Sequence, residues 1–348
     1  MAYTTINDPE KYFQTEIYTG NGTSQSLTLD GDTDLQPDMV WIKSRSAAEN
    51  HVISDSVRGD SGNASGYYQV YPNTDGVEYG GAGNSYITAL NSDGFSVGNN
   101  DVVNTNTQTY VAWNWKESAD SGMDIVAYTG DGVIGTTVAH SLSAKPEFIM
   151  IKARAGTNAA NNWYCWHAAL TANNNLSLNT TAAQFTDPGQ GIIKTTQNTS
   201  NFGFYSSDSS GIVNVNEDGT TFIAYLFAPK QGFSKFGSYT GNNNADGPFI
   251  YTGFKPAWLM VKATDTGQSW SIVDTKRNTY NQTSKTLFAN NSSAEQDSTA
   301  NASFDILSNG FKPRMADADV NGSGNTYIYM AFAEAPFVNS KGVPNNAR

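Results

Sequence analysis

Short runs of aromatic and β-branched residues, separated by longer polar stretches, dominate the hydrophobic pattern of the chain. The most apolar runs open with Thr and follow Asn- or Gly-rich turn residues; they lie at 109–115, 221–227 and 326–332. Runs of this length and composition fit a β-strand buried on both faces better than a helix, which needs more residues and a 3.6-residue period. The pattern therefore predicts one buried strand at the same place in three successive parts of the chain.

Other motifs recur in the same order in each part. A Tyr-Thr-Gly turn begins at Tyr18, Tyr128 and Tyr239, at intervals of 110 and then 111 residues. A Pro followed six residues later by Lys predicts strands that start near the proline, because proline is tolerated at the first residue of a strand. These strands, and those expected to follow them, lie at 37–43, 146–152 and 256–262, and at 50–55, 163–167 and 270–274.

Self-similarity at a fixed period predicts a repeat architecture. Short polar connectors near 120 and 232 divide the chain into an N-terminal arm (1–13), three β units (14–119, 120–232 and 233–337) and a C-terminal tail (338–348). A unit of about 110 residues with several short strands has the size of a β-sandwich. We therefore expect an all-β fold of three tandem, homologous, sandwich-like units of the jelly-roll or lectin-like kind. The units could be separate sandwiches or could share one core around a pseudo-threefold axis, and the sequence leaves both arrangements open.

Composition and charge narrow the function classes. The net charge of −12 argues against a nucleic-acid partner, because binding to phosphate backbones requires clustered Lys and Arg. No apolar run approaches the roughly 20 residues of a membrane span, and the N-terminus lacks the pattern of a secretory signal. We therefore expect neither membrane insertion nor secretion. Cys165 is the single cysteine, so an intrachain disulfide framework is excluded.

Catalytic side chains are scarce. The three histidines are His51, His140 and His167, and Cys165 stands in an aromatic strand beside tryptophans, where a buried, inert thiol is the favoured interpretation. No phosphate-binding loop or zinc-ligand spacing occurs. A catalytic triad would need to converge from this small set. We therefore predict that the protein is not an enzyme and binds no cofactor, with calcium as the one exception considered.

A shared Asp-x-x-Arg pattern joins Asp55 to Arg58 and Asp274 to Arg277. The simplest interpretation is a surface or partly buried ion pair that stabilises the end of a strand. No pair of carboxylates stands out as the acid and base of a glycosidase.

A calcium loop is one interpretation of the segment 317–322. Asp317, Asp319 and Asn321 have the alternating oxygen-ligand spacing of such a loop, and Gly322 follows them. The segment 30–34 is a weaker version of the same pattern. The twelfth position of the first loop is Ile328 where calcium loops carry a bidentate Glu, so an Asx-rich hairpin turn is the favoured alternative.

Four tyrosines in the variable stretch of the first unit differ in setting from the strand aromatics. Tyr67, Tyr68, Tyr71 and Tyr79 lie among Gly, Ser and Asn residues, a composition suited to recognition because Tyr gives contact area and Ser and Asn give hydrogen bonds. The equally weighted alternative is a loop buried against a neighbouring subunit.

Several longer motifs resemble virion proteins of tailed phages that infect marine bacteria. They are Tyr-Thr-Gly-Asn-Gly (18–22), Pro-Asp-Met-Val-Trp-Ile-Lys-Ser-Arg-Ser (37–46), Asp-Ser-Val-Arg-Gly (55–59), Asn-Ser-Asp-Gly-Phe-Ser-Val-Gly (91–98), Tyr-Val-Ala-Trp-Asn-Trp (110–115), Gly-Phe-Ser-Lys-Phe-Gly-Ser-Tyr-Thr-Gly-Asn (232–242) and Asn-Ser-Lys-Gly-Val-Pro (339–344). The resemblance extends over nearly the whole chain. It implies a tail, fibre or structural protein of the virion and brings no catalytic residues with it.

The leading expectation is a non-enzymatic structural protein of a phage virion, forming a tail fibre or appendage that contacts the host surface. The alternative is a capsid (head) decoration or cement protein, and a polysaccharide-cleaving tail enzyme ranks below both. The expected partners are other copies of the chain in a trimer, other virion proteins, and a host-surface glycan or receptor. The expected location is the virion, assembled in the host cytoplasm.

Overall fold

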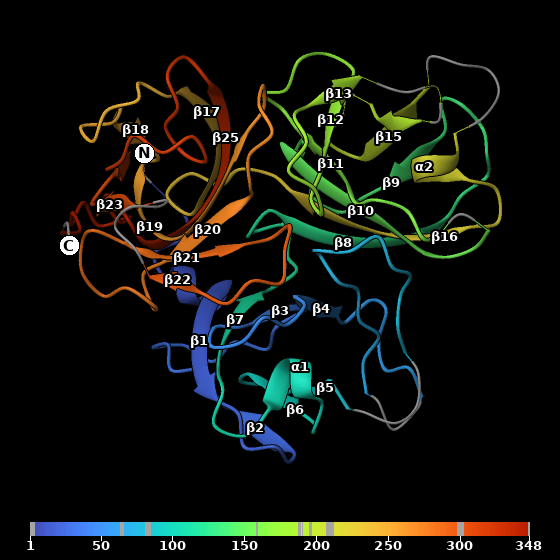
Figure 1. Cartoon of the computed structure of the whole chain (residues 1–348), viewed down its shortest axis with the longest axis horizontal. Coiled ribbons are helices and arrows are strands. Elements are labelled where there is room, and N and C mark those ends of the chain that lie inside the picture. Colours follow the sequence, from blue (N-terminus) through green and yellow to red (C-terminus); the bar gives the residue numbers. More distant parts are fainter. Residues whose placement is uncertain are drawn as a thin grey trace.

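The computed structural model describes residues 4–62, 66–80, 85–157, 159–186, 189, 191–194, 197–206, 212–297 and 303–346. Over these residues the protein is all-β, as the sequence predicts, and its strands pair in antiparallel sheets. The described helices are single turns at η1 (Pro9–Lys11), α1 (Asp101–Asn104) and α2 (Val213–Asn216), and none is long and apolar enough to cross a membrane. Figure 1 shows three sheet-containing lobes arranged around a common centre.

Each lobe is built on one large sheet. The first has the order β1 (Phe13–Thr19), β7 (Thr109–Trp115), β3 (Met39–Ser44), β4 (Val52–Asp55). The second has the order β8 (Met123–Thr129), β16 (Thr221–Phe227), β10 (Phe148–Ala155), β11 (Tyr164–His167), β12 (Asn174–Ser177), β13 (Phe185–Thr186). The third has the order β17 (Ser234–Thr240), β25 (Thr326–Pro336), β19 (Phe254–Ala263), β20 (Ser271–Asp274), β21 (Lys285–Phe288), β22 (Gln296–Asp297).

A small three-stranded sheet accompanies each large one. The first consists of β2 (Gln25–Leu27), β6 (Phe95–Val97) and β5 (Ile87–Leu90). The second consists of β9 (Thr137–Ala139), β15 (Asn201–Tyr205) and β14 (Ile192–Ile193). The third consists of β18 (Ile250–Tyr251), β24 (Gly310–Pro313) and β23 (Phe304–Leu307).

The first four strands of the three large sheets follow one topological order. In each, the opening strand ends in the Tyr-Thr pair of the Tyr-Thr-Gly motif and pairs with the closing strand of its unit, which is far away in sequence. The register is also shared: the residue pairs are Trp41 with Trp113, Met150 with Tyr225, and Met260 with Met330. We call residues equivalent when they occupy the same place in this order, and we use first, second and third unit for 14–119, 120–232 and 233–337. The positions of the unit boundaries stay a prediction.

One face of every large sheet contributes to a single central core. Trp113 packs edge-on against Trp258 with ring centroids 6.1 Å apart, which joins the first unit to the third. Phe148 of the second unit lies 6.4 Å from Trp270 of the third. These residues belong to one continuous cluster of buried apolar side chains drawn from all three units. Of the two arrangements that the sequence leaves open, the structure has the shared core.

The opposite face of the large sheets packs against the small sheets, which completes a sandwich in each lobe. In the first unit, Tyr18 stacks on Tyr110 with ring centroids 5.0 Å apart, and Phe95 of the small sheet meets Tyr18 edge-on. The third unit repeats this stack with Tyr239 on Tyr327, also at 5.0 Å. The recurring aromatic positions of the opening and closing strands therefore bury ring area within each sandwich.

The rule that proline marks the start of a strand holds for two of its three occurrences. β3 begins at Met39 and β10 at Phe148, each two residues after the proline. In the third unit Pro256 lies inside β19, which begins at Phe254. The pairing register of β19 with β25 shifts on both sides of Pro256, and such an irregularity accommodates a residue that cannot donate to the ladder.

Candidate functional site

The three junctions between units repeat one hydrogen bond. A buried aromatic ring at the start of the fourth strand of each sheet bonds to a backbone carbonyl of the neighbouring unit. The three contacts are His51 Nε2 with Phe288 O at 2.9 Å, Trp163 Nε1 with Tyr71 O at 2.9 Å, and Trp270 Nε1 with Ser177 O at 3.0 Å. The contacts run from the first unit to the third, from the second to the first, and from the third to the second, so they close a ring.

His51 is held as a neutral imidazole by these contacts. Trp41 Nε1 donates to His51 Nδ1 at 2.9 Å, so Nδ1 is the acceptor and the proton sits on Nε2, from which it is donated to Phe288 O. Burial, together with the nearby charge of Lys43, lowers the pKa of His51 well below its ordinary value. His51 is thus a structural residue of the junction.

The Asp55–Arg58 pair forms the charged centre of the first–second junction. Both side chains are fully buried, with Arg58 Nε 2.6 Å from Asp55 Oδ2. The second unit contributes Tyr225, whose hydroxyl donates to Asp55 Oδ2 at 2.7 Å, and Arg154, whose Nε lies 2.8 Å from Glu78 Oε2. Glu78 also pairs with Arg58 at 3.3 Å. The sequence-based interpretation of a surface or partly buried ion pair is therefore wrong about burial, because the pair is wholly buried between the first and second units.

The third–first junction contains the same network. Arg277 Nε lies 2.5 Å from Asp274 Oδ2, and Trp113 Nε1 of the first unit donates to that oxygen at 3.0 Å. Glu295 accepts from Arg277 at 3.0 Å and from Arg45 of the first unit at 2.9 Å. Burial opposes the charge of Glu295, but the two guanidinium groups outweigh it and lower the pKa of Glu295 below its ordinary value.

The second–third junction replaces this network with uncharged groups. His167 and Leu170 occupy the places of Asp55 and Arg58 in the second unit, and His167 Nε2 contacts Tyr329 O at 3.3 Å. Burial lowers the pKa of His167 to about 4, so the ring is neutral at neutral pH. One backbone hydrogen bond is kept at this junction: Gln184 N donates to Thr264 O at 2.7 Å. At the two ionic junctions the amides of Glu78 and Glu295 make the equivalent bond, to the carbonyls of Arg154 and Arg45. The buried Asp–Arg–Glu network is thus present at two junctions, and uncharged side chains occupy its positions at the third.

The lysine that ends each Pro-to-Lys motif is buried as well. Lys43, Lys152 and Lys262 are each fully buried, and burial lowers the pKa of each to about 8. Their ammonium groups donate to backbone carbonyls. Two of these bonds cross a junction: Lys152 to Asp75 O at 3.1 Å and Lys262 to Thr181 O at 3.2 Å. In the second and third units, the lysine that ends the motif therefore connects two units.

The remaining candidate nucleophile and histidine lie apart. Cys165 is fully buried, and burial raises the pKa of its thiol far above the ordinary value, as expected of an inert thiol. His140 is partly exposed, and its Nε2 contacts Asn198 O at 3.2 Å. Among the described residues, neither side chain hydrogen-bonds to His51 or His167.

The predicted calcium residues are occupied by hydrogen bonds within the protein. Asp317 Oδ1 accepts from the amide of Asp319 at 2.8 Å, and Asp319 Oδ1 accepts from the amide of Ser269 at 2.9 Å. Asn321 is fully buried, and its amide group donates to Asn244 O at 2.8 Å. Across the described residues no group of three or more His, Cys, Asp or Glu side chains is placed to hold a metal ion. Calcium binding stays a prediction.

The tyrosine loop of the first unit packs largely against its own surroundings. Tyr71 and Tyr86 share a hydrogen bond between hydroxyls at 2.9 Å, and Tyr67 and Tyr71 pack against the outer core of the first unit. The guanidinium of Arg154 lies 5.9 Å from the ring centroid of Tyr68, across the first–second junction. Tyr79 is exposed. The loop thus contacts a neighbouring unit of the same chain, and its role in recognition stays a prediction.

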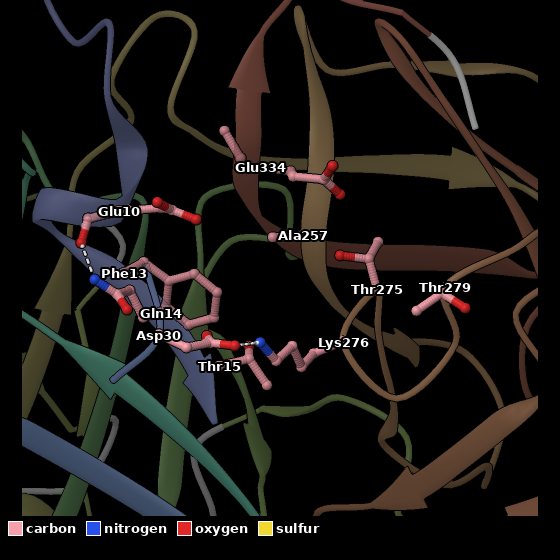
Figure 2. A pocket seen from close by; sticks show the side chains of 11 residues that line it. Glu10, Phe13, Gln14, Thr15, Asp30, Ala257, Thr275, Lys276, Thr279 and Glu334 are labelled. Atoms are coloured by element: carbon pink, nitrogen blue, oxygen red, sulfur yellow. Dashed lines mark hydrogen bonds and ion pairs between the residues drawn. The ribbon is translucent and has the colours of Figure 1, made fainter. Parts of the chain in front are cut away.

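A cleft opens at the outer edge of the third–first junction (Figure 2). It has a volume of about 250 Å³ and is lined by β1, by the loop at Asp30 and by the third unit around Lys276 and Glu334. Figure 2 shows Lys276 reaching across to Asp30, and the two form an ion pair. Glu10 accepts from the amide of Asp32 at 2.7 Å, and Glu334 pairs with Lys255 at 2.7 Å. Each of these three carboxylates therefore has a cation or an amide as a partner.

Glu16 lies near this cleft. One of its carboxyl oxygens, Oε2, is buried without a hydrogen-bond partner. Burial and the charge of Asp30 raise the pKa of Glu16 to about 7, although Lys276 opposes the shift. The carboxyl group is therefore held in an environment that favours its protonated form.

A family comparison matches residues 8–336, almost the entire chain, to a family described as a domain of unknown function, DUF7483. The chain belongs to this family. No curated protein matches the sequence. The family description carries no activity, so the function has to be argued from the chain itself.

Proposed function

We propose that this protein is a non-enzymatic structural component of a phage virion, carried on the tail as an appendage that contacts the host surface. The supporting observation is that its buried charged and histidine side chains make structural contacts between units. The side chains best suited to catalysis instead join the units around one core; they are Asp55, Arg58, Asp274, Arg277 and His51. The resemblance of the sequence motifs to virion proteins of tailed phages supplies the location.

The shared core suits a part that has to keep its shape under load. Removing one member of a buried ion pair costs about 3–5 kcal/mol, because the partner is left as an uncompensated charge. The two ionic junctions therefore penalise partial separation of the units. A mechanically coherent body with variable outer loops is the arrangement that a surface-contacting appendage requires.

We propose that the appendage is a homotrimer, following the class of virion protein that the motifs resemble. Light scattering on the purified chain is expected to give three times its mass of 37.5 kDa. A monomeric mass at high protein concentration would count against self-assembly by this chain alone.

Competition for host attachment tests the proposed contact with the host. Purified protein is added to host cells before the phage, and unadsorbed phage is counted. We expect a saturable reduction in adsorption, which heat-denatured protein does not produce. Full adsorption at saturating protein concentration would contradict host contact and would shift support to a capsid decoration protein.

A further inference from the structure

The outer edges of the three junctions are equivalent, and the first–second edge is filled by the chain itself. Asp38, one residue before β3, accepts from the amide of Glu117 at 2.9 Å and pairs with Lys116 Nζ at 3.0 Å. Glu117 Oε1 accepts from the amide of Ile125 at the edge of β8 at 3.2 Å. These polar groups are therefore satisfied by residues one and two positions beyond the closing strand, or by the next opening strand.

The second–third edge lacks these groups. Glu147 is equivalent to Asp38, Ala228 to Lys116 and Pro229 to Glu117, since β3 pairs with β7 and β10 with β16 in the same register. Proline has no amide to donate, and alanine has no ammonium group. Within the described part of the chain no hydrogen bond or ion pair to the carboxylate of Glu147 is found. A pocket of about 470 Å³ lies at this edge, lined by Glu147 and Pro229 from the second unit and by Lys235, Phe236 and Tyr251 from the third.

An aromatic platform and a cation complete this pocket. The Lys235 ammonium lies 5.2 Å from the ring centroid of Tyr251 and donates to Tyr251 O at 2.7 Å. The exposed fraction of Tyr251 is 45%, a large value for an aromatic residue that lines a concave site.

Both charged groups of the pocket are partly removed from water. Burial raises the pKa of Glu147 even though Lys145 and Lys235 act in the opposite direction, and burial lowers the pKa of Lys235. A ligand that hydrogen-bonds to these groups would restore interactions that their surroundings only partly supply.

We propose that this pocket binds a saccharide unit. A sugar ring presents neighbouring hydroxyls that donate to Glu147 and accept from Lys235, and its C–H face packs on an aromatic ring such as that of Tyr251. Glu147 disfavours a phosphate ligand and Lys235 disfavours a simple cation, because each would meet a like charge. That the saccharide belongs to the host surface rests on the proposed function; the binding site itself does not.

Saturation-transfer NMR with defined probes tests the site. The probes are the methyl glycosides of glucose, galactose, mannose and N-acetylglucosamine, titrated into the full chain. We expect at least one to bind saturably, with a Kd on the order of 1 mM as is usual for a ligand this small. Tyr251→Ala and Glu147→Gln are each expected to weaken binding by about tenfold or more.

Tyr280→Ala is the matched control, because Tyr280 is 81% exposed in the same unit and lies outside the pocket. Glu147→Gln keeps the shape of the side chain, so it remains informative if Tyr251→Ala lowers stability. Failure of all four glycosides to bind, or equal binding by wild type and both pocket variants, would overturn the proposal. Sugar binding without any effect of the protein on phage adsorption would leave the site intact and contradict the proposed function.

Discussion

The hydroxyl of Tyr225 donates a hydrogen bond of 2.7 Å to the carboxylate of Asp55, which lies 170 residues earlier in the chain. Trp113 makes the equivalent contact to Asp274, over 161 residues in the other direction. The two contacts place the closing strand of one unit on the buried ion pair of a neighbouring unit. They are the clearest sign that the three sheets form one body.

Tyr225→Phe removes this contact while keeping the ring. We expect the free energy of unfolding to fall by about 1–3 kcal/mol, because a buried charged acceptor loses a donor. Urea denaturation measures the change, and Tyr280→Phe, at an exposed position, provides the control. Equal stability of the two variants would show that the junction contact contributes nothing.

Asp55→Ala leaves Arg58 buried without its carboxylate. The expected loss is larger, about 3–5 kcal/mol, since Arg58 keeps Glu78, the Ile53 carbonyl and the Tyr225 hydroxyl as partners but loses its closest carboxylate. The matched control is Asp246→Ala, where a carboxylate with 75% of its side chain exposed pairs with Lys312 and Arg314, and a much smaller loss is expected. Similar losses of stability in both variants would mean that the buried ion pair contributes no more than an exposed one.

Glu16→Gln tests the environment of the carboxyl group near the third–first cleft. The pKa of Glu16 in the folded protein, about 7, is above its ordinary value of 4.5. The folded state therefore binds the proton more tightly, and the group costs stability as pH rises from about 4.5 through 7. We expect Glu16→Gln to stabilise the protein at pH 8 by about 1 kcal/mol, after allowance for solvent screening, and to have little effect at pH 4.5. Thermal melts at both pH values measure this, and a pH-independent effect would contradict it.

Chelator titration tests the calcium prediction. If Asp317, Asp319 and Asn321 held calcium, adding EDTA would lower the melting temperature and added calcium would restore it. The hydrogen bonds of these side chains lead us to expect no shift. A calcium-dependent shift that Asp317→Ala abolishes would overturn this expectation.

Much of the fold could be predicted from the sequence. The runs 109–115 and 221–227 coincide with β7 and β16, and the third run lies within β25, which continues to Pro336. These strands are buried on both faces, so their composition carries a strong signal. The strands expected at 50–55, 163–167 and 270–274 begin later than predicted. Their first residues, such as His51 and Trp163, leave the ladder to reach a neighbouring unit.

The junctions could not be predicted in the same way. Nothing local in the sequence indicates that Asp55 meets Tyr225, because the contact depends on how three sheets close into a ring. The candidate pocket at Glu147 did leave a signal that sequence reasoning missed. Glu117 and Glu334 stand two residues after the closing run in the first and third repeats, and Pro229 stands there in the second. A comparison of the three repeats, position by position, reveals this substitution.

The position of the protein on the virion can be seen by labelling intact virions with antibody fragments raised against this chain, followed by electron microscopy. We expect label on the tail, at its tip or fibres. Label distributed over the head would contradict the tail assignment in favour of a capsid decoration protein. Virions without label, from a preparation in which the denatured chain is detected in infected cells, would contradict a virion role altogether.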